Sequence, residues 1–448
     1  MDRPIAEIPR WRTLRNAPKF LKDPIALMES NIKQYGSTYR FQLGNHPAIF
    51  TADPGFIQHV LQKQHRKYIK SPPHFEKLAR YLGHGLLTID GPYWLRQRRL
   101  IQPGFHRQRI ASLATLMNQV IDDFIEDFDD QVDKEHDLFD AMQELAFQII
   151  ARSIFNLQID RASLNTISNS ISEIQRYVIK EIRTPFLIPW LKVSGQQGKT
   201  RRLAAQNDEI ILKLIRDRKL SGEPMDDLLQ MLLDARYEDD GGAMSDQQLL
   251  DEVKILFVAG HDTSGNALSW TLYLLAKHPE WQKRLQTEVD KLLNGRLPEV
   301  TDLKTLEQTT QVIQESMRLF PPAWITDRMS ISEDHYKGVD IEKGTLLITF
   351  LYGAHHHPGH WTDPESFRPD RFSPEQRDKI NSAAYLPFGA GPRLCIGNSF
   401  AMMEMQLVLS RLLQRYTFRL SPNTQIEKLA LVTLKPKYGV RLMVEKRT

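Results

Sequence analysis

One segment of the 448-residue chain, residues 245–277, constrains the fold more than any other. Apolar side chains occur on almost every side of this segment, which is typical of a helix that is buried all round. Ser245 and Gln248 predict a capping box at its start, and His278-Pro279 predict its end. At ~1.5 Å per residue such a helix would be roughly 50 Å long. The sequence therefore predicts a central helix that crosses the whole core.

The centre of this predicted helix is polar, with the sequence Gly260-His261-Asp262-Thr263-Ser264-Gly265. Unpaired polar groups in a core each cost about 1 to 3 kcal/mol, so these residues need an explanation. One interpretation is a helix kink in which the Thr263 hydroxyl donates to the carbonyl of Ala259. The other is a site where the helix admits a small ligand beside a hydroxyl and the Asp262 carboxylate. The segment alone leaves both open.

The remaining pattern predicts an α+β fold that is mostly helical. Helical spacing of apolar residues dominates from about 94 to 236, and Asp53-Pro54 predict a further helix start. No repeat or long flexible linker divides the chain. Alternating or β-branched runs predict strands at 38–44 and 48–51, joined by an Asn45-His46-Pro47 turn, and at 345–350, 428–433 and 440–444.

Composition excludes several classes of protein. An apolar content of 41% with 25% charged residues is ordinary for a globular protein and excludes wholesale disorder. Apolar runs are shorter than the ~18 to 20 residues of a membrane span. Charges throughout the first 25 residues leave no signal-peptide core, so we expect a cytoplasmic protein. The formal charge of +4 is too mild to indicate nucleic-acid binding.

The chain has one cysteine, Cys395, which cannot form an internal disulfide. A buried, inert thiol is the commoner case. However, Cys395 precedes a helical pattern, and a helix N-terminus favours the thiolate. Gly391 and Gly397 permit tight backbone near the sulfur, and Arg393 adds a cation that a carboxylate could bind. Zinc is unexpected with a single cysteine, whereas haem iron needs only one protein ligand.

The segment Phe388–Gly397 matches Phe-x-x-Gly-x-Arg-x-Cys-x-Gly and resembles the haem-thiolate loop of the cytochromes P450. Four further motifs of that family precede this loop in the chain, in the same order as in the family. The resemblance therefore covers nearly the whole chain. The four motifs are Trp94-x-x-x-Arg98, Ala259-Gly260-His261-Asp262-Thr263, Glu315-x-x-Arg318 and Pro369-Asp370-Arg371-Phe372.

The resemblance implies one domain, residues 1–448, with haem between two lobes. The implied helical lobe surrounds the long central helix and comprises approximately 92–325 and 395–416. The implied smaller β-rich lobe comprises approximately 37–70, 330–352 and 417–446.

The resemblance also implies roles for individual residues. Cys395 would be the proximal ligand of the iron in haem b, and backbone donors after it, near Gly397, would tune the metal. Phe388 would shield the sulfur side of the ring. Trp94, Arg98 and Arg393 would bind the haem propionates.

Two further sets of residues have implied roles. Asp262 and Thr263 would be catalytic and deliver protons to bound dioxygen. Glu315, Arg318 and Arg371 would form a buried ion network that holds the haem loop.

The family takes its substrate contacts from four segments, which are nearly all apolar here. This favours a lipophilic substrate, although several of these side chains could merely pack the core. The stretch Met317–Trp324 is similar to members that oxidise fatty acids, terpenoids or carotenoids. The candidate pocket residues are Leu86, Leu87, Phe257, Ala259, Ala323, Trp324, Ile325 and Thr433, with Phe75, Leu78, Leu82 and Val432 in the same segments.

Two other clusters need separate interpretation. His355, His356, His357 and His360 look like metal ligands by composition, but neighbours on an extended strand point to opposite faces, so we expect no metal there. The run Arg96, Arg98, Arg99, with Arg107 and Arg109 beyond it, is either a solvated helix face or a basic docking surface for an electron donor. The sequence leaves these two readings open.

The resemblance therefore predicts a haem-thiolate monooxygenase that hydroxylates or epoxidises its substrate with dioxygen. No reductase domain follows the last strand, so electrons would come from NAD(P)H through a reductase and a ferredoxin or flavodoxin type donor. We expect a soluble, bacterial-type monomer without a membrane span. Alternatives are a peroxide-dependent or isomerising relative, which often lacks the acid–alcohol pair, a haem-thiolate sensor or carrier, and a thiol hydrolase with a distant histidine base.

Overall fold

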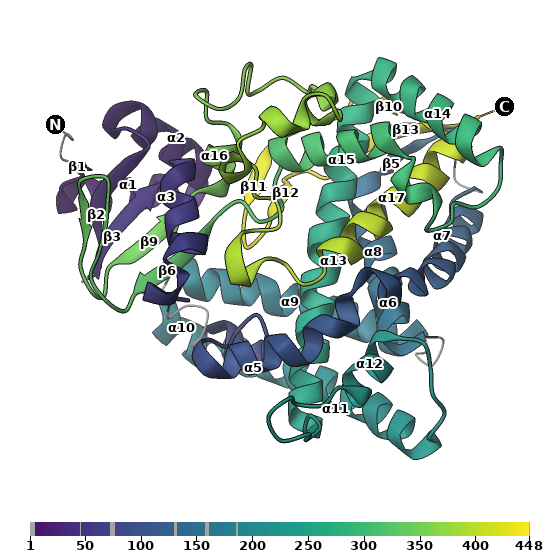
Figure 1. The fold of residues 1–448 in the computed structure, drawn as a ribbon, viewed down its shortest axis with the longest axis horizontal. Helices are drawn as coiled ribbons and strands as arrows, with labels where there is room; N and C mark the ends of the chain where they lie inside the picture. Colours follow the sequence, from purple (N-terminus) through teal and green to yellow (C-terminus); the bar gives the residue numbers. More distant parts are fainter. Residues whose placement is uncertain are drawn as a thin grey trace.

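The structure is a computed structural model that describes residues 5–44, 46–71, 77–129, 132–156, 161–184 and 187–447. It is an α+β fold dominated by helices. Figure 1 shows the strands near the N-terminus gathered at one side of the molecule, and helices filling the remainder. This distribution confirms the fold class that the sequence predicts.

The central helix α13 spans Asp246–Lys277, as predicted, and begins at Ser245. The Ser245 hydroxyl accepts from the Gln248 backbone N–H at 3.2 Å. The reciprocal half of the expected capping box is not made, because the Gln248 side chain binds Tyr93 and Glu252 instead. Leu268 and Trp270 lie on opposite sides of α13 and are both fully buried, so the helix is enclosed by protein. Its neighbours include α8 (Leu138–Phe155), α15 (Glu307–Leu319) and α17 (Asn398–Arg415).

Many of the other described helices bury side chains in one large apolar core, whereas several near the N-terminus pack in smaller clusters, and the first helix buries no residue. No helix in the described ranges combines the length and the apolar content that crossing a bilayer requires. The remaining helices are α1 (Arg10–Lys22), α2 (Pro24–Tyr35), α3 (Pro54–Gln58), α4 (Ala79–Leu82), α5 (Gly91–Ile101), α6 (Arg107–Ala111), α7 (Leu113–Asp129), α9 (Arg161–Arg183), α10 (Ile188–Val193), α11 (Gln196–Ser221), α12 (Leu228–Asp234), α14 (Pro279–Leu293) and α16 (Leu351–His355).

The largest sheet joins segments from both ends of the chain. Strands β2 (Thr38–Leu43) and β3 (His46–Thr51) form the predicted antiparallel hairpin, although His46 and Pro47 belong to β3 and Asn45 lies outside the described residues. Strand β9 (Leu346–Thr349) then pairs with β3 in parallel. The full order is β1-β2-β3-β9-β6-β4, with β1 at Ala6–Glu7, β6 at Thr326–Ser330 and β4 at Tyr68–Ile69.

The C-terminal strands lie apart from this sheet. Strands β10 (Tyr416–Leu420), β13 (Arg441–Lys446) and β5 (Glu135–Asp137) form a second sheet. Phe418 and Val444 are buried in the same core as the helices. Residues 417–446, which the sequence analysis placed in the β-rich lobe, thus include strands whose apolar side chains the helices cover. Two hairpins remain, β7–β8 (Asp334–Tyr336, Val339–Ile341) and β11–β12 (Lys428–Ala430, Leu434–Pro436).

A carboxyl group lies buried where α17 meets α13. Glu404 of α17 is 1% exposed, and its nearest polar neighbour is Ser264 of α13. Burial raises the pKa of Glu404 to about 8, an effect that Ser264 partly offsets. The group therefore enters the fold with its proton and carries a penalty when it ionises.

We predict that Glu404→Gln makes stability less dependent on pH. A carboxyl whose pKa is raised on folding contributes stability below its unfolded pKa of ~4.3, and this contribution is lost as the pH rises towards 8. The melting temperature of the variant should therefore gain on the wild type by a few degrees between about pH 5 and pH 8. Thermal unfolding followed by circular dichroism measures this difference in melting temperature, with the exposed Glu238→Gln variant as control. A difference between Glu404→Gln and wild type that stays the same from pH 5 to pH 8 would contradict the raised pKa of Glu404.

Candidate active site

The Cys395 loop is a tight turn that leads into α17. The Cys395 backbone N–H donates to the Phe388 carbonyl at 2.9 Å, and Leu394 N–H donates to the Gly391 carbonyl at 3.0 Å. Gly391 has φ +68°, and a Cβ there would lie 2.2 Å from the Leu61 carbonyl oxygen. Only glycine fits that position. Gly397 is the residue that caps α17, so Cys395 precedes the helix by three residues.

The environment of the Cys395 thiol is less favourable to a thiolate than its helix-start position predicts. The side chain is accessible, yet the surrounding protein raises the pKa of the thiol by desolvation. The backbone N–H of Gly397 and the cation of Arg98 act in the opposite direction and do not outweigh it. A stable thiolate here therefore needs a further positive partner, and a bound metal ion supplies one.

Trp94 and Arg393, far apart in sequence, meet beside this loop. The Arg393 guanidinium lies 3.6 Å from the centre of the Trp94 ring. It also forms an ion pair with Asp90 and donates to the Ile89 carbonyl at 3.2 Å. Arg98 lies on α5 one turn after Trp94, and its field reaches Cys395. The structure thus brings together the residues that the motifs suggested.

Two cations that the motifs do not contain join this group, Lys70 and Arg328. Lys70 Nζ donates to the carbonyls of Leu86 at 3.2 Å and Ile89 at 3.3 Å. Strands β4 and β6 pair with Ile69 opposite Met329, so the register sets Lys70 opposite Arg328. Neither residue belongs to a motif, so the sequence did not indicate them. The strand register places them together, and this register is known only once the fold is known.

Burial and mutual repulsion weaken the protonation of these cations. Burial, together with repulsion from Arg393 and Arg328, lowers the pKa of Lys70 to about 7. Burial likewise lowers the pKa of Arg393 to about 10, with Asp90 opposing and Arg328 and Arg98 adding to the effect. The cations of this group, Lys70, Arg98, Arg328 and Arg393, outnumber the carboxylates beside them, among which is Asp90. Such a surplus suits a ligand with two negative groups, and the two propionates of haem fit it beside a thiol ligand.

The polar centre of α13 remains helical throughout. Thr263 Oγ1 donates to the Ala259 carbonyl at 2.7 Å, which is the bond of the first interpretation above. A Cβ on Gly260 would meet Ile150 of α8 at 2.9 Å, so this glycine lets two helices approach closely. The Thr263 oxygen keeps lone pairs that can accept a hydrogen bond.

The Asp262 carboxylate is buried and bound by two residues of the C-terminal hairpin. Its side chain is 3% exposed and forms an ion pair with Lys435. Thr433 Oγ1 donates to Asp262 Oδ2 at 2.6 Å. Thr433, which the sequence analysis placed among the pocket residues, thus directs its hydroxyl to Asp262. Lys435 was not foreseen, because nothing in its local sequence indicates a distant carboxylate.

Glu315, Arg318 and Arg371 form one buried network. Arg318 donates to Glu315 through Nε at 2.7 Å and Nη2 at 2.8 Å, and both side chains are fully buried. Arg371 Nε donates to Glu315 at 3.3 Å, and Arg368 N–H at 2.9 Å. Arg318 Nη1 also donates to the carbonyls of His355 and Pro364, at 3.0 and 2.7 Å. The network ties α15 to the segment that precedes the Cys395 loop.

The histidines near residue 356 differ from the expected extended strand. His355 ends helix α16, and its Nε2 accepts from the Leu386 backbone N–H at 2.8 Å. Burial lowers the pKa of His355 to about 3, so it stays neutral. His356 Nδ1 pairs with the Tyr352 carbonyl at 2.8 Å. His355 therefore holds the backbone of a distant segment, whereas the partner of His356 lies in the adjoining helix α16.

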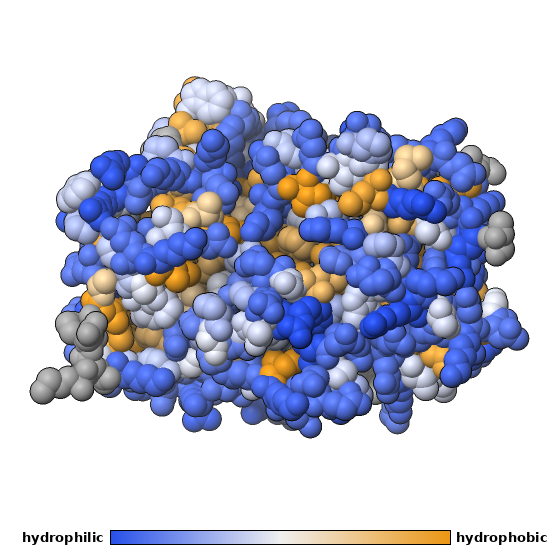
Figure 2. Space-filling model, turned by 90° about the horizontal axis from the view of Figure 1, so that it is seen from above, coloured by the Kyte–Doolittle hydropathy of each residue, from blue (hydrophilic) through white to orange (hydrophobic). Residues whose placement is uncertain are grey.

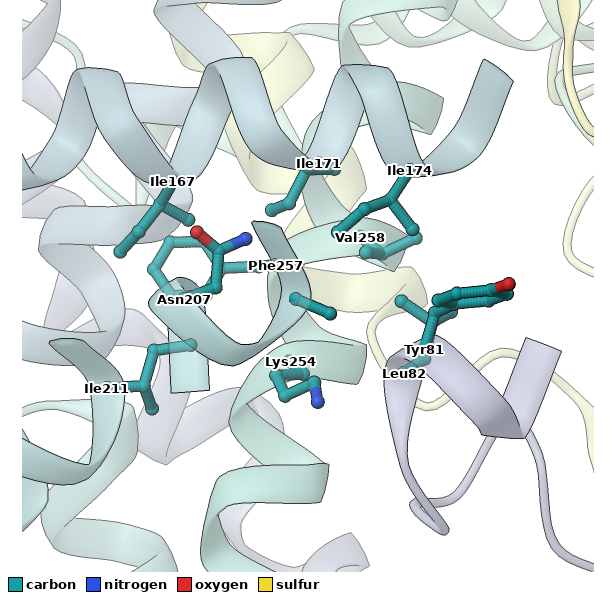
Figure 3. A pocket seen from close by; sticks show the side chains of 11 residues that line it. Tyr81, Leu82, Ile167, Ile171, Ile174, Asn207, Ile211, Lys254, Phe257 and Val258 are labelled. Atoms are coloured by element: carbon teal, nitrogen blue, oxygen red, sulfur yellow. The ribbon is translucent and has the colours of Figure 1, made fainter. Parts of the chain in front are cut away.

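An apolar cavity lies between α4, α9, α11 and α13 (Figure 3). Phe257 of α13 projects between isoleucines of α9 and α11 and lines this cavity. Leu82 lines it as well, and Phe75 lies outside the described residues. The lining residues are Tyr81, Leu82, Ile167, Ile171, Ile174, Ala204, Asn207, Ile211, Lys254, Phe257 and Val258.

The other expected pocket residues differ in exposure. Leu87, Ala259 and Ala323 are exposed, and Leu86 is half-buried. Trp324 is 3% exposed and donates through Nε1 to the Leu431 carbonyl at 3.0 Å, so it packs in the core next to Ile325. This outcome corresponds to the core-packing alternative.

The arginine run is only partly free. Arg96 forms ion pairs with Asp239 at 2.9 Å and Asp240 at 2.6 Å. Arg99 and Arg109 are exposed, while the side chain of Arg107 lies outside the described residues. The part of this surface able to meet an acidic partner is therefore smaller than the sequence indicates.

Comparisons with known proteins identify the family of the chain. The family model described as Cytochrome P450 matches residues 7–442. Cyclooctat-9-en-7-ol 5-monooxygenase of Streptomyces melanosporofaciens is 31% identical over 397 residues, covering 89% of this chain and 86% of the relative. Protein LUTEIN DEFICIENT 5, chloroplastic, of Arabidopsis thaliana is 29% identical and covers 92% of this chain and 73% of the relative.

The fold agrees as well. A crystal structure of the cytochrome P450DA heme domain matches with a TM-score of 0.91 at 24% identity, covering 100% of this chain and 98% of that one. Since the family model spans nearly the whole chain and ends beyond the Cys395 loop, the chain belongs to the cytochrome P450 family and is a cytochrome P450 monooxygenase.

Proposed function

We propose that this monooxygenase hydroxylates or epoxidises a lipophilic substrate, a terpenoid, carotenoid or fatty acid, with electrons from a separate ferredoxin or flavodoxin type donor. The observation that carries the proposal is the Cys395 loop, with its surplus of buried cations, together with the Asp262–Thr263 pair on α13. The relative whose name gives cyclooctat-9-en-7-ol as substrate supports the terpenoid option. The apolar lining of the cavity beside Phe257 supports a lipophilic ligand.

The residues of the loop would hold haem b. Haem, when bound, supplies the iron centre at which dioxygen is activated and an oxygen atom is transferred to substrate. Cys395 would ligate the iron, and Phe388 and Gly397 would shape the sulfur environment. Trp94, Arg98 and Arg393, with Lys70 and Arg328, would bind the propionates, which relieves the repulsion among these cations.

The proton-handling residues Asp262 and Thr263 are consecutive in α13, so their side chains leave the helix about 100° apart. Thr263 Oγ1 is held by the Ala259 carbonyl at 2.7 Å, so its own lone pairs can orient a water or a ligand oxygen. Asp262 forms an ion pair with Lys435 and accepts a hydrogen bond from the Thr433 hydroxyl. A carboxylate held in this way can take up protons at the edge of the site and release them towards Thr263. A sensor or carrier needs no such pair.

We predict that reduced, CO-treated holoenzyme absorbs near ~450 nm, the mark of a thiolate-ligated haem. Cys395→Ala should abolish this band, because no other thiol exists in the chain. Difference spectroscopy on wild type and variant, each checked for folding by circular dichroism, measures it. A band that survives the substitution would refute ligation by Cys395.

We predict that Thr263→Ala lowers the yield of product per electron consumed by about tenfold, within the usual range for loss of one proton-transfer group. The matched control is Thr271→Ala, since Thr271 makes the same bond to its own helix, to the Ala267 carbonyl at 2.7 Å, within the core. Product and NAD(P)H consumption are quantified together. Equal yields for the two variants would disprove the role of Thr263.

We predict that Arg99→Glu slows reduction by an acidic donor protein severalfold, and more so at low salt. Arg99 is exposed on α5, the helix that carries Trp94 and Arg98. Arg419→Glu, which also reverses an exposed cation but on β10, is the control. Stopped-flow reduction rates that are the same for both variants would contradict docking on this helix.

A further inference from the structure

Helix α1 packs against the protein with its polar side and turns its apolar side outward. None of its 13 residues is buried. Trp11 is 55% exposed and Leu14 76% exposed, and Phe20 and Leu21 are exposed as well. The residues that the protein partly covers are Arg12, Thr13 and Asn16. This arrangement is the reverse of an ordinary surface helix, whose apolar stripe faces the core.

The helical period sorts the exposed side into two bands. At ~100° per residue, Leu14, Ala17, Pro18 and Leu21 share one face, with Trp11 at its edge. Arg15, Lys19 and Lys22 follow along the border beyond Trp11. The helix carries five cations, Arg10, Arg12, Arg15, Lys19 and Lys22, and no acidic residue. An exposed apolar stripe is therefore bordered by positive charge.

The stripe continues onto a second element. Arg10 Nη2 donates to the Gly44 carbonyl at 3.4 Å, which places the start of α1 beside the turn between β2 and β3. Leu43, next to that glycine, is 49% exposed. Figure 1 shows α1 at the outer edge of the molecule, beside these two strands. Two separate segments thus present apolar side chains at the same corner.

We propose that α1 and the adjacent Leu43 turn bind the surface of an anionic lipid bilayer. In the bound state, Trp11, Leu14 and Leu21 enter the boundary between headgroups and acyl chains, while Arg15, Lys19 and Lys22 stay among the phosphates. A helix with an apolar face of Trp, Phe and Leu bordered by Lys and Arg is the form that lies in a membrane interface. The long Lys and Arg side chains reach back to the headgroups while their stems stay apolar.

The charge on α1 decides between a lipid surface and a second copy of the chain. A symmetric dimer through this face would bring five cations of one copy against five of the other, with no acidic residue on either helix to offset them. An anionic bilayer removes that conflict, because each cation near such a surface is attracted to it. The surface contact would hold the enzyme where lipophilic molecules accumulate, and it does not depend on which substrate is oxidised.

The test uses full-length holoenzyme and sedimentation with lipid vesicles, one set of phosphatidylcholine alone and one with phosphatidylglycerol added. We expect binding to the anionic vesicles that weakens as salt is raised. The double variant Leu14→Asp, Leu21→Asp and the triple variant Arg15→Glu, Lys19→Glu, Lys22→Glu should each lower the partition coefficient by about tenfold or more. Leu220→Asp, at an 85% exposed leucine of α11, is the matched control and should bind as wild type does.

The CO-difference spectrum of every variant shows whether the protein is folded and loaded, independently of lipid. The proposal is overturned if wild type does not sediment with anionic vesicles, or if the α1 variants bind as well as the Leu220→Asp control. It is also overturned if light scattering without lipid shows a dimer that the α1 variants abolish, since the stripe would then serve self-association.

Discussion

The Glu315 carboxylate is the interaction on which the rest of the site depends. It is fully buried and takes hydrogen bonds from two arginine side chains and the backbone N–H of Arg368. Removing one partner of such a buried charge costs about 3 to 5 kcal/mol, because the remaining charge is left without compensation. Arg318 also binds the His355 carbonyl, and His355 holds the Leu386 backbone. The position of the cysteine loop thus follows from an ion pair about eighty residues earlier.

Electrostatics of the site show a second dependence. Desolvation raises the pKa of the Cys395 thiol and lowers that of Lys70 and Arg393, so burial opposes the charged form of each group. A protein does not gather such groups for stability. Their arrangement is explained if a metal offsets the thiolate and two carboxylates offset the cations. The side chains of this site therefore do not balance one another's charges by themselves.

The sequence motifs were strong where chemistry requires particular residues at short spacing. Glu315 and Arg318 lie three apart on one helix, so the ion pair is nearly a local property. The central helix was equally predictable, because caps and apolar pattern are local as well. The capping box was only half right, since the Gln248 side chain is bound by Tyr93, a residue 155 positions away. The bonds of Trp324 to Leu431 and of Thr433 to Asp262 could not be predicted, because they depend on tertiary packing, which a short motif does not contain.

The sequence by itself determined the family, the thiol that would bind iron and the helix that carries Asp262 and Thr263, since each follows from residue type and spacing along the chain. Only the tertiary structure decided the partners that tune them: Lys435 on Asp262, Arg328 and Lys70 beside Arg393, and the outward-facing apolar stripe of α1. The physical reason is the range of the forces. Backbone geometry and caps act over a few residues, whereas desolvation and charge pairing depend on whatever the fold brings within a few ångströms.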